Sequence, residues 1–242
     1  MSELPYVDTD EPFPNIETAL DDPNGLLCWG GALNAARLQR AYAQGIYPWF
    51  SPGQPVLWWT PEPRMVLAVA DFKLQRSLLK VIRNSGFEVR VDTAFERVIR
   101  HCGETPRPGQ DGTWITDSIV AAYVELHNEG LAHSVETWRE GELVGGLYGV
   151  SLGDMFFGES MFAHARDASK VALAHLVAQL HRWEMPWIDC QQETEHLASL
   201  GAKPIARATF AAQVAQLVSL PSRKGTWRFD EDLFGTQIDV RD

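Results

Sequence analysis

The sequence lacks any apolar run long enough to cross a membrane. A spanning helix needs about 18 consecutive apolar residues, and the 242 residues contain no such stretch. The opening residues, MSELPYVDTDEPFP, are acidic and interrupted by proline, which is the wrong chemistry for a secretion signal. We therefore expect a cytoplasmic protein that does not enter a membrane.

Cysteines and cofactor motifs are also scarce. The three cysteines, Cys28, Cys102 and Cys190, lack metal-ligand spacing, so we expect reduced thiols rather than a disulfide framework. None of the seven histidines belongs to an H-E-x-x-H pattern, and the chain has neither a phosphate loop nor a G-x-G-x-x-G turn after a strand. The sequence therefore predicts no metal site and no cofactor, ATP and NAD included.

Positive charge is in short supply, with 21 Lys and Arg against 32 Asp and Glu and a net charge of −11. Such a chain should not bind tightly along a nucleic acid, because that affinity comes mostly from neutralised phosphates. The charge pattern favours solvated helix faces for the basic residues and leaves a local basic patch as the alternative. The candidates for that patch are Lys73, Arg76, Lys80, Arg83, Arg97 and Arg100.

The composition changes near residue 62. Residues 1–62 are dense in proline, glycine and tryptophan, and they contain one clear helix, which Asn34 can cap and Gly45 ends. The remainder alternates between helical and strand-like patterns. We therefore expect a small N-terminal domain over 1–62 and a larger domain over 63–242.

The larger domain should be mixed α+β, with a central sheet flanked by helices. Apolar residues alternate with polar ones in some segments and recur at helical spacing in others. Asp167 stands where it can cap the longest helix. The expected strands are 87–91, 133–139, 143–151, 155–162 and 187–191, and the expected helices follow Asp71 and Asp92 or span 116–128, 168–183 and 208–219.

One short match, Gly149-Val150-Ser151-Leu152-Gly153, fits the G-x-S-x-G pattern of a serine hydrolase. That chemistry places the serine on a sharp turn between a strand and a helix. The residues that follow look like a turn into another strand. We therefore expect no nucleophilic serine at this position.

Three polar residues interrupt apolar strand segments. Asp189 and Gln191 are two apart on one strand, so their side chains should leave the same face of the sheet. They either satisfy backbone groups at a strand end or contact a reacting amine or carbonyl. Glu159 is costly to bury without a partner, so it should pair with Arg166, with Lys170 or with a cationic group of a ligand.

Tryptophan is abundant, with nine in the chain. Four of them, Trp29, Trp49, Trp58 and Trp59, lie within the first 62 residues. Most should form core. One or two exposed indoles can instead stack on a nucleobase, a binding mode that does not require a positive protein.

The chain carries many ordered blocks of sequence. The blocks are Pro23-Asn24-Gly25-Leu26-Leu27, Gly30-Gly31, Ala41-Tyr42, Gly45-Ile46-Tyr47-Pro48-Trp49-Phe50, Trp58-Trp59, Pro63-Arg64, Thr113-Trp114-Ile115, Ala132-His133-Ser134-Val135-Glu136, Gly145-Gly146-Leu147-Tyr148-Gly149, Phe157-Gly158-Glu159-Ser160-Met161-Phe162, Ala168-Ser169-Lys170, Ile188-Asp189-Cys190-Gln191 and Ala198-Ser199-Leu200-Gly201-Ala202. With these blocks the chain resembles the leucyl/phenylalanyl-tRNA–protein transferase family over nearly its whole length. Their number makes this resemblance more specific than any single motif.

The resemblance implies a small N-terminal domain packed on an acyltransferase domain of the GNAT type. It also implies a reaction in which Leu, Phe or Met moves from aminoacyl-tRNA to a protein that begins with Arg or Lys, which marks that protein for degradation. The aminoacyl ester is already activated, so no cofactor is needed. The enzyme must supply positioning, a deprotonated amine and stabilisation of the oxyanion.

The resemblance further implies roles for single residues. Asp189 would orient Gln191, and Gln191 would contact the attacking amine. Trp49 and Trp114 would hold the terminal adenosine, while Glu159 would contact the acceptor's cation or a ribose hydroxyl. The apolar pocket for the aminoacyl side chain would be lined by Phe156, Gly158, Met161, Leu173 and Ile188.

Two other functions fit parts of the sequence. A small-molecule N-acyltransferase that uses an acyl thioester would need a glycine and arginine turn for the pyrophosphate, which Arg166-Asp167-Ala168-Ser169 supplies poorly. A non-catalytic RNA-binding module would leave Asp189 and Gln191 without a purpose. We expect the chain to act as a monomer.

Overall fold

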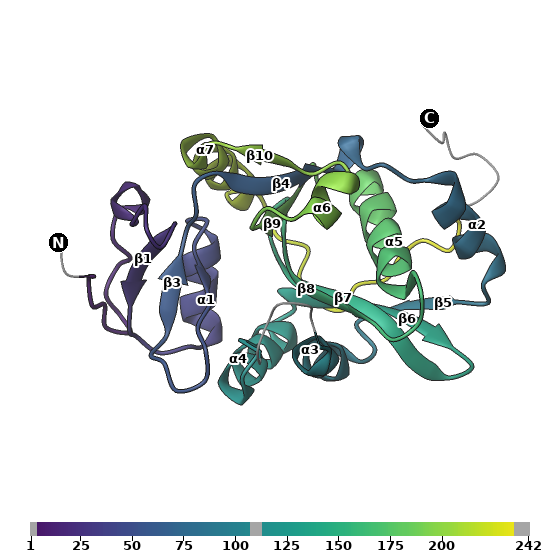
Figure 1. Cartoon of the computed structure of the whole chain (residues 1–242), viewed down its shortest axis with the longest axis horizontal. Helices are drawn as coiled ribbons and strands as arrows, with labels where there is room; N and C mark the ends of the chain where they lie inside the picture. The colour runs from purple at the N-terminus through teal and green to yellow at the C-terminus, as the bar shows by residue number, and fades with distance from the viewer. Residues whose placement is uncertain (1–3, 107–112, 235–242) are drawn as a thin grey trace.

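The protein, seen in a computed structural model that describes residues 4–106 and 113–234, is built on two sheets within those ranges. The smaller sheet has the order β1-β3-β2 and lies at the left of Figure 1, beside helix α1. Helix α1 begins after Asn34, whose side chain accepts a hydrogen bond from the N–H of Arg37 at 2.8 Å. The elements of this part are η1 Ile16–Thr18, β1 Leu26–Trp29, α1 Ala35–Tyr42, β2 Tyr47–Pro48 and β3 Leu57–Trp59.

The larger sheet has seven strands in the order β10-β4-β9-β8-β7-β6-β5. Neighbouring strands pair antiparallel except β8 and β9, which are parallel. The sheet is therefore mixed, as expected. Its strands are β4 Arg64–Ala68, β5 Glu88–Val91, β6 Ala132–Arg139, β7 Glu142–Leu152, β8 Met155–Ala163, β9 Trp187–Gln191 and β10 Lys203–Ile205.

Helices cover both faces of this sheet. Helix α5 lies on one face, and α3 and α4 lie on the other (Figure 1). Helix α5 packs through the apolar stripe Leu173, Leu176 and Leu180, all buried. The helices are η2 Val69–Asp71, α2 Arg76–Asn84, α3 Phe95–Glu104, α4 Asp117–Asn128, α5 Ala168–Arg182, α6 Glu195–Ser199 and α7 Arg207–Val218.

The predicted fold class is confirmed, and three local expectations are wrong. Strands β4 and β10 were not expected, since each is short and lies in a stretch without clear alternation. The helix after Asp71 begins only at Arg76, because the 3-10 turn η2 comes first. Asp167 adopts a left-handed conformation and makes no side-chain cap for α5; its carboxylate lies 3.2 Å from the Lys170 ammonium instead.

One hydrophobic core runs across the predicted boundary near residue 62. Tyr42 and Ile46 from the first part pack in the same cluster as Phe157 and Phe210 from the second. Gly45 lies so close to Phe210 that an added Cβ would stand 2.7 Å from its ring. The boundary itself stays a prediction. Among the described residues, no helix is long and apolar enough to span a bilayer.

The parallel pair β8 and β9 sets the position of the site. Their pairing runs from Met155 and Trp187 to Phe157 and Asp189. Beyond that point β8 continues against β7 while β9 continues against β4. The two strands therefore part in the middle of the sheet, and the polar residues that follow the last pair lie where they separate.

Candidate active site

Glu159 and Gln191 meet where β8 and β9 part. The side-chain amide of Gln191 donates from Nε2 to Oε1 of Glu159 at 2.6 Å. The hydroxyl of Tyr42 donates to the same oxygen at 2.7 Å, and that of Tyr123 donates to Oε2 at 3.0 Å. The two hydroxyls also contact each other. Three hydrogen bonds from α1, α4 and β9 therefore fix the carboxyl group of Glu159.

This network changes the titration of its members. Burial raises the pKa of Glu159 to about 7, against the opposing effect of the tyrosine hydrogen bonds. Burial, followed by the charge of Glu159, also raises the pKa values of Tyr42 and Tyr123 well above their ordinary range. Near neutral pH the carboxyl group can therefore exist with or without its proton, while both phenols stay protonated.

The expectation that Arg166 or Lys170 pairs with Glu159 is wrong. Both cations lie beside Asp167, with nitrogen to oxygen distances of 3.5 Å and 3.2 Å. Hydroxyl and amide donors satisfy the carboxyl group instead, so it needs no cation from these two residues. The two hydroxyl partners of Glu159, Tyr42 and Tyr123, can be read from the sequence, but their places on apolar helix faces were sufficient to explain both.

Gln191 leaves the regular strand geometry. The pairing of β9 with β4 shifts between Asp189 and Gln191, and Gln191 has a φ of 62°. A non-glycine residue in that region carries strain of roughly 1–3 kcal/mol and persists only when its surroundings hold it there. This bulge interrupts the regular alternation of the strand between Asp189 and Gln191.

Asp189 supports Gln191 through the backbone. Its Oδ1 accepts the N–H of Gln191 at 2.9 Å, and no contact with the side-chain amide of Gln191 is described. The same carboxylate accepts two hydrogen bonds from Arg64, from Nε at 2.8 Å and from Nη2 at 2.7 Å. Asp189 and Arg64 are both fully buried. Asp189 therefore orients Gln191 through its main chain, and Arg64 holds the carboxylate of Asp189 that does so.

Arg64 was not identified as a candidate from the sequence. Its guanidinium lies between the rings of Tyr47 and Phe210, at 4.8 Å and 4.6 Å from the centroids. Burial lowers its pKa, but the charge and hydrogen bonds of Asp189 outweigh burial and raise the pKa above its ordinary value. The block Pro63-Arg64 was the only sequence signal for it, and a single arginine gives no indication of a buried carboxylate 125 residues away.

A cavity of about 210 Å³ lies beside Gln191, and Trp49 and Trp114 both line it. Trp49 is 38% exposed, so part of its ring is available to a ligand. The rings of Trp49 and Trp59 form an edge-to-face pair at a centroid distance of 5.4 Å, and the carbonyl of Trp49 accepts a hydrogen bond from Nε1 of Trp59 at 2.7 Å. These contacts hold Trp49 against Trp59 at the wall of the cavity.

An apolar pocket of about 880 Å³ adjoins this cavity. The two share Glu159, Cys190 and Thr194 as walls. Burial raises the pKa of Cys190 to about 12, so its thiol is not ionised near neutral pH and is a poor nucleophile. The lining of the apolar pocket includes Phe156, Gly158, Met161, Leu173 and Ile188.

Each of the ten residues singled out from the sequence lines one of these two spaces. Asp189 and Glu159 also border the apolar pocket, and Gln191 borders the cavity with the two indoles. Ser151, from the G-x-S-x-G match, is buried within β7, which runs on into β8 through a turn. The described residues include no group of three His, Cys, Asp or Glu side chains that could hold a metal ion.

The fold places side by side the parts that an acyltransferase needs. An apolar pocket opens beside a cavity lined by two indoles, and Glu159, which borders both, accepts a hydrogen bond from the side-chain amide of Gln191. Such an arrangement suits the direct transfer of a bound acyl group to a second bound substrate.

Comparison with known proteins gives the family. The model of the leucyl/phenylalanyl-tRNA protein transferase family matches residues 66–215, and the model of its N-terminal domain matches residues 31–62. A leucyl/phenylalanyl-tRNA–protein transferase of Thiobacillus denitrificans is 59% identical over 90% of this chain and 95% of its own length. Those of Bordetella avium and Leptothrix cholodnii are 55% and 58% identical over 95% and 94% of this chain, covering 96% and 91% of their own lengths. The chain therefore belongs to the leucyl/phenylalanyl-tRNA–protein transferase family.

Proposed function

We propose that the protein transfers leucine or phenylalanine, and also methionine, from aminoacyl-tRNA to the N-terminal Arg or Lys of an acceptor protein. The observation that carries this proposal is the junction of the two cavities at Glu159, Cys190 and Thr194. An acyl side chain in one cavity and an adenosine in the other would place the ester between them, beside Gln191. The relatives' names and the family membership support the same reaction.

The apolar pocket selects the donor. Its lining of aromatic and aliphatic side chains favours apolar groups that are not branched at Cβ and disfavours polar or charged ones. One methylene changes discrimination by only about 1–3 kcal/mol in such a pocket. Overlap between Leu, Phe and Met therefore follows from its chemistry. The adenine would stack on Trp49 or Trp114, a contact that needs no basic residue.

The reaction balances without an added reagent. The acceptor's amine attacks the ester carbonyl carbon, the new C–N bond forms, and the C–O bond to the ribose breaks. The nitrogen loses one proton and the ribose oxygen gains one. An α-amine has a pKa near ~8, so little help is needed to deprotonate it near neutral pH.

Gln191 would position the amine. Because its Nε2 donates to Glu159, its Oε1 is turned to accept an N–H from the attacking nitrogen. Glu159 and the backbone contact from Asp189 hold the amide in this orientation. The charge of Glu159 also favours a cationic N-terminal residue nearby. Transfer would take place in the cytoplasm, where charged tRNA is made, and would mark the acceptor for degradation.

The test mixes purified protein with Leu-tRNA and peptides that begin with Arg, Lys or Ala. We expect labelling of the first two peptides only, and none when the amine is acetylated. Equal labelling of all three would overturn the acceptor assignment, and no labelling would overturn the reaction. An acyl thioester replaces the tRNA in a parallel reaction, because transfer from the thioester alone would favour the small-molecule N-acyltransferase.

A further inference from the structure

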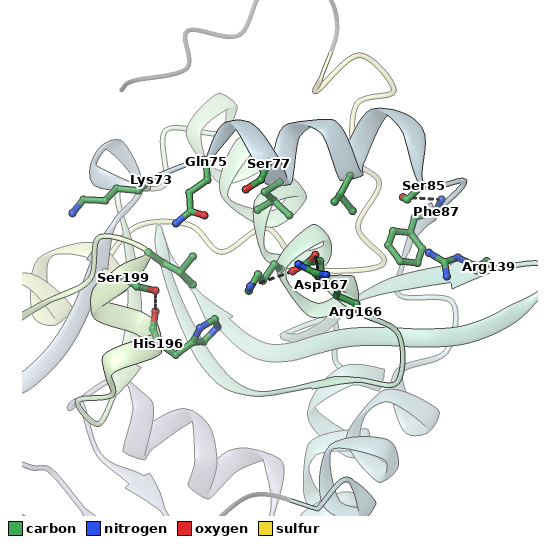
Figure 2. A pocket seen from close by; sticks show the side chains of 14 residues that line it. Lys73, Gln75, Ser77, Ser85, Phe87, Arg139, Arg166, Asp167, His196 and Ser199 are labelled. Carbon is green, nitrogen blue, oxygen red and sulfur yellow. Dashed lines mark hydrogen bonds and ion pairs between the residues drawn. The ribbon is translucent and has the colours of Figure 1, made fainter.

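Phe156 separates the apolar pocket from the core behind it. Its side chain is fully buried, yet it lines the pocket, so its ring belongs to the inner wall. The pocket is also lined by Thr194, His196 and Leu197, from α6 and its N-cap. Figure 2 shows α6 from a separate cavity of about 530 Å³, which His196 and Ser199 border. The apolar pocket therefore has a wall on a short helix and a wall that continues into the core.

The ring of Phe156 lies against a glycine of the neighbouring strand. A Cβ at Gly149 of β7 would stand 2.6 Å from two carbons of this ring and 2.3 Å from the carbonyl oxygen of Phe157. A glycine inside a strand often marks such a close approach. The first glycine of the G-x-S-x-G match therefore gives room to an aromatic ring.

Trp227, from the chain after α7, packs against the same ring. The ring centroids of Trp227 and Phe156 are 5.9 Å apart, with an angle of 39° between the planes. Trp227 is buried, and it shares one hydrophobic cluster with the pocket residues Phe156, Leu173 and Ile188. It does not line the pocket itself. Any effect of Trp227 on a bound donor must therefore pass through residues such as Phe156.

Stacking and hydrogen bonds fix Trp227 in this place. Its indole stacks on His133, with 3.7 Å between the centroids and 8° between the planes. Its backbone N–H donates to Oδ2 of Asp92 at 2.7 Å, and the same oxygen lies 2.9 Å from Nδ1 of His133. The indole Nε1 donates to the carbonyl of Arg223 at 3.0 Å. Because the side chains of Asp92 and His133 are buried, the indole is held from within the core.

The segment that carries Trp227 is also tied to helix α5. This segment, yellow in Figure 1, passes α5 on its way to the C-terminus. Oε1 of Gln179 accepts the backbone N–H of Asp230 at 2.7 Å, and Arg182 donates to the carboxylate of Asp230 at 2.9 Å. Helix α5 supplies Leu173 to the pocket. The segment therefore joins two walls of the pocket, one on α5 and one on β8.

We propose that Trp227 is a positioning residue that sets the depth of the apolar pocket by fixing the ring of Phe156, and thereby sets the balance between larger and smaller donors. The inference rests on the proposed function, because that function fills the pocket with an aminoacyl side chain. In a close-packed interior the ring of Phe156 has no free space behind it. Without the indole, the ring moves into the vacated space and the pocket deepens. A larger side chain gains more from this change than a smaller one.

The test compares Phe-tRNA with Leu-tRNA as donors to one acceptor peptide. For Trp227→Leu, we expect the ratio of kcat/KM for Phe-tRNA to kcat/KM for Leu-tRNA to rise about tenfold. Trp227→Phe keeps one ring and should raise the same ratio by about threefold, which keeps the test open if Trp227→Leu does not fold. The matched control is Phe229→Leu, because Phe229 packs on Trp183 and Trp227 but does not line the pocket. This control should lower stability and leave the ratio unchanged.

A double variant tests whether Trp227 acts through Phe156. When Trp227→Leu is added to Phe156→Leu, the ratio should stay at the value of Phe156→Leu, because the ring that moves is gone. An unchanged ratio in both Trp227 variants, an equal rise in Phe229→Leu, or a further rise in the double variant would each overturn the inference.

A crystal structure of Trp227→Leu gives a measurement that does not depend on transfer. We expect the ring of Phe156 to lie in the space that the indole leaves, and a ring that stays in its wild-type place would contradict the inference. If the wild-type protein transferred neither amino acid, the proposed function would fail. The position of the ring would then still decide whether Trp227 fixes Phe156.

Discussion

At the scale of single residues, the buried pair Arg64 and Asp189 makes the site vulnerable to loss of one partner. Both side chains are fully buried and joined by two hydrogen bonds. Removing one partner leaves an uncompensated charge, which typically costs about 3–5 kcal/mol. We expect Arg64→Met to lower the free energy of unfolding by that amount, measured by urea denaturation.

Two further variants make this test specific. In Arg64→Met with Asp189→Asn no buried charge is left, so much of the lost stability should return. Arg100→Met removes an exposed pair with Glu96 and should cost less than about 1 kcal/mol. A similar loss of stability in Arg64→Met, in the double variant and in Arg100→Met would show that burial of the pair does not determine the loss.

Glu159 should give the protein a pH-dependent stability. Its pKa rises from 4.5 to about 7 on folding, so between these values the folded protein keeps a proton that the unfolded chain releases. The free energy of unfolding should therefore fall as pH rises through this window. Glu159→Gln cannot titrate, so the stability difference between wild type and variant isolates the effect. Denaturation midpoints at several pH values measure it, and a difference that is flat or rises with pH would contradict the assignment.

Gly158 lines the apolar pocket, where it leaves room that a side chain would fill. A Cβ at this position would stand 3.4 Å from the carbonyl oxygen of Asp189 and 3.6 Å from Ile188, contacts that the fold can accept. Gly158→Ala should therefore fold normally but narrow the pocket. We expect kcat/KM for Phe-tRNA to fall about tenfold relative to that for Leu-tRNA. An equal change for both donors would indicate that the pocket does not select by size.

At the scale of secondary-structure elements, the sequence patterns predicted the long helices and strands and missed the short strands. The apolar stripe of α5 and the alternation in β6, β7 and β8 are long enough to read from sequence. Strand β4 has five residues and β10 has three, so each is too short to show a clear alternation of apolar and polar residues. The pairing of β4 with β9 and of β10 with β4 depends on contacts far apart in the chain.

The same contrast between local sequence patterns and long-range contacts applies to the candidate site. Ten of the residues that line the two cavities were singled out through the resemblance, because nearly all of them lie in recognisable blocks. The bulge at Gln191 and the hydroxyl network around Glu159 were not predicted, since both arise only when β9 meets β4 and when α1 and α4 meet β8. A rule of alternation cannot foresee the residue at which a strand departs from it.

At the scale of the whole molecule, the shared core predicts that the two parts unfold together. Tyr42 of α1 donates a hydrogen bond to Glu159 of the large sheet, and one apolar cluster contains residues from both sides of residue 62. A part that buries its apolar surface against another loses stability when the other unfolds. Thermal unfolding followed by tryptophan fluorescence, to which residues 1–62 contribute four of the nine indoles, should coincide with unfolding followed by circular dichroism of the helices, most of which lie in the larger part. Gly45→Leu would place a larger side chain against the Phe210 ring and should lower both midpoints equally, whereas two separated transitions would show that the small sheet folds by itself.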